Sequence, residues 1–435
     1  MTKRRYTMTE KIIKTDIANG VVGVYIPTKR FKTARLSVEF ELPLREETAS
    51  ANALLPFMLT GSSKEYPTSM IISRRLDNLY GANLECSCEK RGDSQVLKMS
   101  IASIENKYSL DDRNIVGDCA EMLVSLIFNP LVDGDRFDEK SFAKERRLMV
   151  EKIEGEINNK RNYALYRCES ELLKGEPASI ARYGSREGQL ALTAADLYTA
   201  WKRALSSAFI RIGYLAAEPD ESIFDRFKSA FAKIERQPEP ILSPVVRPAK
   251  EVVSEIEDRM TVNQGKLVLG FRSSIYGDDR ETYKMMVFSD LFGGGPYSLL
   301  FDNVREKMSL CYYCASRTNR RKGILTVDSG VEFANMDKAY DEVLNQLDRL
   351  KKGDFDDSLL DASKKSLCES FRALGDSQSV LDRYYADRVH SSNPLTPDEL
   401  SDLVCSVTRE DIIAVANTLT LDTVYRLKAT EEMKK

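Results

Sequence analysis

Residues Met285–Arg317, MMVFSDLFGGGPYSLLFDNVREKMSLCYYCASR, contain the order of elements that decides the fold. An apolar run ends at the segment GGGP, residues 293–296, which is a poor helix interior but suits a tight reversal of the chain. Leu300, Val304 and Met308 then follow at intervals of four residues, which places them on one face of a second helix. A short strand follows at Leu310–Arg317. The stretch therefore predicts helix, turn, helix and strand.

The same order recurs near the start of the chain. Residues Ser50–Cys88, SANALLPFMLTGSSKEYPTSMIISRRLDNLYGANLECSC, again place an apolar run before a glycine, then a helix and a strand. Downstream, FDEKSFAKERRLMVEKI from Phe137 resembles FDDSLLDASKKSLCESF from Phe355 at a constant offset along both segments. A repeat with a period near half the chain length predicts two homologous domains rather than a solenoid.

The length of the chain agrees with a division into two domains. A chain of 435 residues can form two domains of about 200 residues, each with its own core. The proline-rich segment RQPEPILSPVVRPAK, residues 236–250, predicts an extended connector between them. We therefore predict domains at residues 1–235 and 251–435. Each is expected to be of the α+β class, with a mainly antiparallel sheet backed by helices.

Composition argues against several classes of partner. The net charge of −3 gives no electrostatic reason to expect nucleic acid or an anionic membrane surface. No apolar run reaches the length of a membrane span and no signal-peptide pattern occurs, so we expect a cytoplasmic protein. The eight cysteines are then expected to be free thiols. Cys311 and Cys314 have the spacing of a redox or zinc pair, but in a regular strand residues three apart point to opposite faces.

The chain resembles a known family of peptidases. The repeat, the three glycines at 293–295 and the pattern LFxxVREKxxLxY of residues 300–312 resemble the pitrilysin/insulinase family of inverted-motif zinc peptidases. Residues 183–197 and 407–412 extend the resemblance over nearly the whole chain. It implies two halves that close like a clamshell around an unfolded peptide.

The chemistry of that family needs His-x-x-Glu-His on a helix, which supplies two zinc ligands and a general base. Counting back from Gly61 places the five motif positions at residues 52–56, where both ligands and the base are replaced, by Asn52, Pro56 and Leu55. Because proline lacks a backbone donor, Pro56 predicts a helix that is kinked or begins late. The third zinc ligand of the family falls at one of two positions, Glu151 or Lys152.

A count of histidines agrees with the loss of the zinc site. The chain has one histidine, His390, whereas catalytic zinc sites are usually built from at least two histidines and a carboxylate. The sequence also lacks a Gly-x-Ser-x-Gly elbow and a phosphate-binding Gly-x-x-x-x-Gly-Lys-Ser/Thr loop. A Cys–His nucleophile pair would need His390 to meet a thiol. Alone, the chain is expected to hold no cofactor and not to act as a peptidase.

Three hypotheses from different classes follow. The resemblance implies first a non-catalytic, substrate-binding subunit of a bacterial heterodimeric zinc metalloendopeptidase. Its homologous partner would carry His-x-x-Glu-His and the zinc. In active members an arginine and a tyrosine at the spacing of Arg305 and Tyr312 contact the peptide carbonyl that is attacked, so both side chains are expected to face the inner cavity. The alternatives are a peptide-binding scaffold without a role in chemistry, and an enzyme with a different mechanism.

Overall fold

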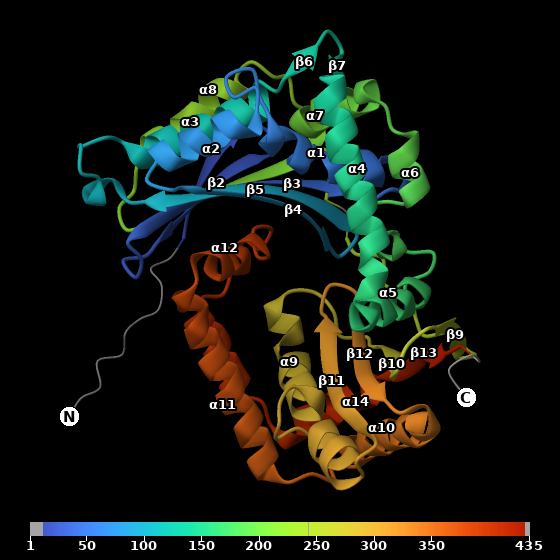
Figure 1. Cartoon of the computed structure of the whole chain (residues 1–435). Helices are drawn as coiled ribbons and strands as arrows, with labels where there is room; N and C mark the ends of the chain where they lie inside the picture. The colour runs from blue at the N-terminus through green and yellow to red at the C-terminus, as the bar shows by residue number, and fades with distance from the viewer. Residues whose placement is uncertain (1–11, 242, 431–435) are drawn as a thin grey trace, which may run out of the picture. The chain divides into compact units, whose positions relative to one another are not determined.

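The computed structural model describes residues 12–241 and 243–430, which form two compact units (Figure 1). Unit 1 comprises residues 1–154, 180–243 and 374–394, and unit 2 comprises residues 155–179, 244–373 and 395–435. One boundary between the units, between residues 243 and 244, falls within the proline-rich segment 236–250. The units are nevertheless not the contiguous ranges 1–235 and 251–435. Residues 155–179 from the first half belong to unit 2, and residues 374–394 from the second half belong to unit 1.

Unit 1 is built on a six-stranded sheet with the order β1-β2-β8-β3-β5-β4. All neighbouring strands are antiparallel except β2 and β8. The strands are β1 (Ile13–Ala18), β2 (Val21–Pro27), β3 (Thr33–Pro43), β4 (Asn83–Arg91), β5 (Ser94–Ile104) and β8 (Phe209–Ala216), with a small ribbon of β6 (Val132–Asp133) and β7 (Arg136–Phe137). The helices are α1 (Glu46–Gly61), α2 (Ser69–Asn78), α3 (Ile115–Phe128), α4 (Glu139–Gly155), α6 (Arg186–Ala191), α7 (Ala194–Ser207), α8 (Glu221–Phe231) and α12 (Gln378–Ala386).

The central strand β3 separates the two faces of this sheet. Its even-numbered residues, such as Leu36, Val38 and Phe40, point into an apolar core covered by α1, α3, α7 and α8. Its odd-numbered residues, which include Arg35, Glu39 and Glu41, are also buried although they are charged or polar. The cover on that second face is α12, which lies on the opposite side of the sheet from α1 and α3 (Figure 1).

Unit 2 is built on a five-stranded sheet with the order β11-β12-β10-β13-β9. Only β13 and β9 are parallel. The strands are β9 (Ser254–Met260), β10 (Gly265–Arg272), β11 (Cys311–Asn319), β12 (Ile324–Val331) and β13 (Thr420–Ala429). The helices are α5 (Lys160–Leu172), α9 (Asp279–Gly293), α10 (Met336–Lys351), α11 (Asp357–Ala373), α13 (Pro397–Cys405), α14 (Arg409–Thr418) and a π-helix at Phe301–Lys307.

The two sheets share one topology. In the first sheet, β4-β5, β5-β3 and β3-β8 are antiparallel neighbours and β8-β2 is a parallel pair. In the second sheet, β11-β12, β12-β10 and β10-β13 are antiparallel neighbours and β13-β9 is a parallel pair. The long charged helices repeat at the predicted spacing, because α4 and α11 both span 17 residues and their first residues, Glu139 and Asp357, are as far apart as Phe137 and Phe355. The predicted order of helix, turn, helix and strand in Met285–Arg317 is present as α9, residues 294–300, the π-helix and β11.

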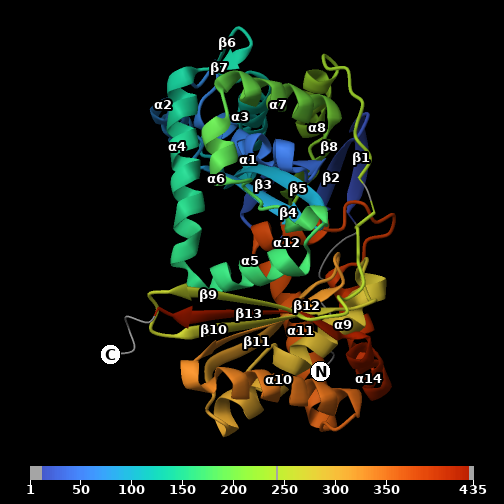
Figure 2. The same ribbon diagram turned by 90° about the vertical axis from the view of Figure 1, so that its right-hand side faces the viewer.

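Helix α5 covers the second face of the unit 2 sheet, on the side away from α10 and α14 (Figure 2). Ala164, Leu165 and Cys168 of α5 pack against Val268 and Tyr425 in an apolar cluster. Gly270 of β10 provides room for this helix, because a Cβ atom there would lie 2.9 Å from Leu172. Each sheet is therefore covered on one face by helices of its own half of the sequence and on the other by a helix from the other half.

Candidate functional site

The helix in which the resemblance places the zinc motif is α1, and it begins at Glu46 and runs through Pro56 to Gly61. The predicted late start is therefore wrong. The Asn52 side chain is fully buried; its Nδ2 donates to Gln95 Oε1 at 3.1 Å and its Oδ1 accepts from Arg203 Nη2 at 2.6 Å. A buried amide that is bonded through both of its polar atoms serves the packing of unit 1.

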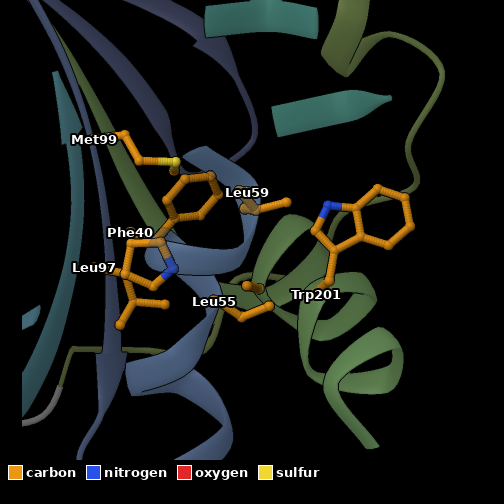
Figure 3. Close-up of a pocket in the computed structure, with 8 residues that line it drawn as sticks. Phe40, Leu55, Leu59, Leu97, Met99 and Trp201 are labelled. Atoms are coloured by element: carbon orange, nitrogen blue, oxygen red, sulfur yellow. The ribbon is translucent and has the colours of Figure 1, made fainter. Parts of the chain in front are cut away.

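Leu55 and Pro56 point into the apolar core. They line a cavity of about 10 Å³ between α1, the sheet and α7 (Figure 3). Its remaining walls are equally apolar: Phe40, Leu59, Leu97, Met99, Trp201 and Ala204. Zinc in proteins is bound by cysteine, histidine, aspartate or glutamate side chains, and none of these lines the cavity. The residues at positions 52–56 therefore do not fit a zinc ion.

Helix α4 presents Lys152, not Glu151, to α1. The Lys152 ammonium lies 4.6 Å from the centre of the Phe57 ring and 5.1 Å from that of the Tyr183 ring. Glu151 instead pairs with Arg147 on its own helix at 2.5 Å, with 54% of its side chain exposed. A protonated amine cannot donate an electron pair to a metal, so the position that faces α1 does not fit the third zinc ligand either.

The contact with Phe57 shows which residue of α1 the Lys152 ammonium meets. Side chains four residues apart lie on one face of a helix, so Ala53 shares the face of Phe57. Phe57 lies one residue after Pro56, the last of the five motif positions obtained by counting back from Gly61. A motif shifted by one residue, to 53–57, would put Pro56 at the position of the general base, whereas the frame 52–56 puts Leu55 there. Within residues 12–241 and 243–430, no group of three or more His, Cys, Asp or Glu side chains could hold a metal ion.

Arg305 and Tyr312 lie at the same end of β11 in unit 2. Arg305, on the π-helix, stacks on Phe301 with its guanidinium carbon 4.5 Å from the ring centre and pairs with Glu306 at 3.5 Å. Tyr312 is 60% exposed, and its hydroxyl donates to Glu332 Oε1 at 3.3 Å. Both side chains reach solvent within this unit, and their carboxylate partners Glu306 and Glu332 lie at its surface. Their predicted role in a partner's site stays a prediction.

Cys311 and Cys314 are closer than predicted. A bulge between Cys311 and Tyr313 shifts the register of β11 against β12, so both cysteines point into the helix-covered core of unit 2. The prediction that they face opposite sides is wrong for this reason. A hydrogen bond from the Cys314 thiol lowers the pKa of Cys311 against the effect of burial, and the Arg305 guanidinium lowers it further. The same hydrogen bond, with burial, raises the pKa of Cys314 well above its ordinary value.

The sequence interpretation missed a network of buried charges on the second face of the unit 1 sheet. Asp382 of α12 accepts hydrogen bonds from Lys98 Nζ at 2.9 Å and Ser37 Oγ at 3.0 Å, and it pairs with Arg211 Nη2 at 2.8 Å. Lys98 also pairs with Glu39 at 2.9 Å. The alternating charges of ARLSVEFEL are the signal in the sequence, but an alternating strand ordinarily turns its charges toward water.

The pKa values of these carboxyl groups follow from their cationic partners. Burial alone would raise the pKa of Asp382, but the nearby Arg211 and Lys98 outweigh it and hold the pKa below its usual range. For Glu39, burial is likewise outweighed by Lys98, Arg91 and Arg211, and its pKa is lowered. The ionised form of both carboxyl groups is thus favoured by the fold. The network is a structural device, since its members pair with one another.

The single histidine belongs to the same face of the sheet. His390 Nε2 lies 2.9 Å from Glu41 Oε2, and its ring packs on Phe209 with 4.5 Å between the centres. Its neighbours are a carboxylate and an aromatic ring, so the structure gives no support to a Cys–His nucleophile pair.

Comparisons with known proteins point to one family. Residues 191–367 match the family described as Peptidase M16 inactive domain. The probable inactive metalloprotease YmfF of Bacillus subtilis is 29% identical over 412 residues, which cover 95% of this chain and 96% of that protein. In the part of the chain that the structure describes, no helix has the length and apolar character needed to span a membrane.

Solved structures show the same fold over nearly the whole length of the chain. A conserved protein from Enterococcus faecalis superposes with a TM-score of 0.88 at 26% identity, covering 97% of this chain and 99% of that one. The peptidase M16 inactive domain from Pseudomonas fluorescens has the same fold, with a TM-score of 0.78 at 16% identity and coverage of 97% and 99%.

Proposed function

We infer that this chain works as the non-catalytic subunit of a two-subunit zinc metalloendopeptidase. The reason is its similarity to inactive members of the M16 peptidases, the pitrilysin/insulinase family. In this proposal a homologous partner carries His-x-x-Glu-His and the zinc. This chain contributes to binding of an unfolded peptide and supplies Arg305 and Tyr312 to the partner's site. We place the pair in the cytoplasm, in keeping with eight cysteines that are all free.

The observation that carries the proposal is a contrast between the two units. In unit 1 the positions that the resemblance gives to the zinc ligands and the base hold packed side chains, Asn52, Leu55 and Pro56, and α4 turns the Lys152 ammonium toward α1. In unit 2, Arg305 and Tyr312 remain accessible at one end of an edge strand. Loss on one side and retention on the other is what a subunit that depends on a partner's metal requires.

Both side chains have the chemistry for this role. When water attacks a peptide carbonyl, negative charge develops on its oxygen, and fixed donors aimed at that oxygen lower the barrier. Arg305 and Tyr312 together offer a permanently charged fork and a hydroxyl. Their present partners, Glu306 and Glu332, are surface carboxylates that a substrate can replace at small cost.

The test is reconstitution with the homologous subunit that carries an intact motif. We expect hydrolysis of an unfolded peptide only by the pair, with zinc bound in the partner. Arg305→Ala and Tyr312→Phe should each lower kcat by about 10²–10³ without preventing assembly, since each removes one donor to the oxyanion. Lys307→Ala and Tyr276→Phe, at exposed positions of the same unit, are the matched controls and should keep full activity.

A second function is favoured by the same surface contacts. If both variants keep full activity in an assembled pair, Arg305 and Tyr312 are ordinary surface residues. The remaining interpretation is then a peptide-binding or scaffold pseudo-peptidase. Equal binding of an unfolded peptide by the chain with and without its partner would support that alternative.

A further inference from the structure

We propose that Cys368 and Cys405 form a reversible disulfide, a modification site in unit 2 that is separate from the function proposed above. Cys368 lies on α11 and Cys405 is the last residue of α13. Their sulfur atoms are 3.2 Å apart, within about 1.2 Å of the length of a disulfide bond. A small adjustment of two packed helices is enough to join them.

The two thiols differ in access, which suits a stepwise oxidation. Cys405 is exposed, whereas Cys368 is 7% exposed and its thiol also points toward the Ser401 carbonyl at 3.8 Å. A reagent from solution therefore meets Cys405 first. Cys368 is then placed to resolve the product, because its sulfur lies 3.2 Å from that of Cys405. The other cysteines of the unit lie apart from this pair, on β11 and α5.

The pair is not required by the fold that the two units share. Helices α4 and α11 are related by the internal repeat, and the position equivalent to Cys368 is Val150. Unit 1 packs its long helix without a thiol there. The juxtaposition of Cys368 and Cys405 is thus a feature added to unit 2.

The reaction is thiol–disulfide exchange with a low-molecular-weight disulfide such as oxidised glutathione. The Cys405 thiolate attacks one sulfur of the reagent, its S–S bond breaks, and one small thiolate leaves. The Cys368 thiolate then attacks Cys405 Sγ, which forms the Cys368–Cys405 bond and releases the second small thiolate. The two protons lost by the cysteines end on the two released thiolates. Protein dithiol and one small disulfide become protein disulfide and two small thiols.

The consequence of the bond follows from the path of the chain. Residues 374–394, which include α12, belong to unit 1, whereas α11 before them and α13 after them belong to unit 2. A bond between Cys368 and Cys405 closes a loop around this whole segment. Oxidation would therefore link α11, after which the chain leaves unit 2, to α13, where the chain has returned to unit 2.

The disulfide of this pair is expected to form slowly. Burial, and the hydrogen bond with Cys368, raise the pKa of Cys405. Little thiolate is present at neutral pH, so the exchange is slow and the disulfide should be measured after equilibration.

The experiment uses the full chain in excess oxidised glutathione, followed by alkylation, tryptic digestion and mass spectrometry. We expect a cross-linked peptide of residues 366–372, SLCESFR, and residues 389–409, VHSSNPLTPDELSDLVCSVTR, which reduction separates. Its yield should fall at least about tenfold when oxidation is done in concentrated urea, because unfolding removes the proximity of the thiols. Cys368→Ala should abolish the cross-link and leave Cys405 with bound glutathione.

Two results would overturn the proposal. One is a native chain in which Cys405 stays free, or carries only glutathione, after equilibration. The other is a cross-link that forms equally well in native and unfolded chains. Cys86→Ser, a change at a half-buried cysteine of unit 1, is the control and should leave the cross-link unchanged.

Discussion

Replacing Asp382 by asparagine tests how α12 is held on the sheet of unit 1. The aspartate is 2% exposed and is the common partner of Lys98 and Arg211, whose side chains are 12% and 1% exposed. Arg35 approaches the same carboxylate at 3.8 Å. The change to asparagine keeps the volume and one acceptor oxygen but removes the charge. It therefore takes one counter-ion from Lys98 and Arg211, which keep Glu39 at 2.9 Å and 3.9 Å.

The expected loss follows from the burial of the partners. Removing one member of a buried ion pair costs about 3–5 kcal/mol, because the remaining charge stays desolvated without compensation. The matched control is Arg383→Ala on the same helix, which removes an ion pair with Glu89 whose members are 64% and 41% exposed. An exposed pair of this kind contributes about 0–1 kcal/mol.

Unfolding in urea, followed by fluorescence, measures the difference in unit 1 alone. The chain has one tryptophan, Trp201, which is 8% exposed in α7 and donates from Nε1 to the Ile127 carbonyl at 2.9 Å. With an m-value of about 3 kcal/mol/M, Asp382→Asn should lower the midpoint by about 1–1.7 M urea. A shift no larger than that of Arg383→Ala would refute the reasoning, because the carboxylate would then be dispensable.

The pH dependence of stability provides a second measurement of the same network. The folded pKa of Asp382 lies below that of an unfolded aspartate, about 3.9. Its contribution is therefore fully present above pH 4 and is lost as the pH falls below that value toward the folded pKa. The wild-type midpoint should fall steeply below pH 4, and the Asp382→Asn chain should show a shallower decline. Parallel curves would contradict this assignment.

The remaining predictions concern α1 and its surroundings. Leu55→Ala should lower the stability of unit 1 by about 2–5 kcal/mol by enlarging an existing cavity, whereas Glu151→Ala should change it by less than about 0.5 kcal/mol; urea unfolding of both decides. Gly184→Ala should lower stability by at least about 1 kcal/mol, since φ is +68° and a Cβ atom would lie 2.7 Å from the Ser50 nitrogen; an unchanged midpoint would contradict this. Two frames of the lost motif can be compared by restoring it at 53–57 or at 52–56, each with Lys152→Glu: if the residue that meets Lys152 marks a ligand position, elemental analysis should find about one zinc per chain for 53–57 and none for 52–56. The first of these variants combines Ala53→His, Pro56→Glu and Phe57→His with that change.

Local patterns allowed much of the fold to be predicted. The glycines at 293–295 and the two related segments from Phe137 and Phe355 depend on neighbouring positions, and α9, β11 and the pair α4 and α11 appear where they were expected. Asn19-Gly20, a dipeptide typical of tight hairpin turns, is a local signal of the same kind and joins β1 to β2, where Gly20 has φ of +68°. The residues that determine each of these features lie within a few positions of one another in the sequence.

Contacts between elements that lie far apart in the sequence could not be predicted in the same way. Lys98 and Asp382 are 284 residues apart, and the charges of β3 look like a solvated face until α12 is known to cover them. The candidate site shows the same limit, because counting residues does not reveal which face of α1 meets Lys152. The bulge in β11, which brings Cys311 and Cys314 to one face, likewise leaves no mark in the spacing of the sequence.

The sheet of unit 1 is covered on one face by a helix from the other half of the sequence, and this has a consequence for synthesis of the protein on the ribosome. The last strand of the unit 1 sheet ends at Ala216, and Asp382 of α12 is added only after most of the second half has been made. At about 5–20 residues per second, the sheet waits roughly 8–33 s for the helix that neutralises it. During that time the charged face of the sheet lacks the helix that covers it in the folded unit, so the first half of the chain cannot complete unit 1 on its own.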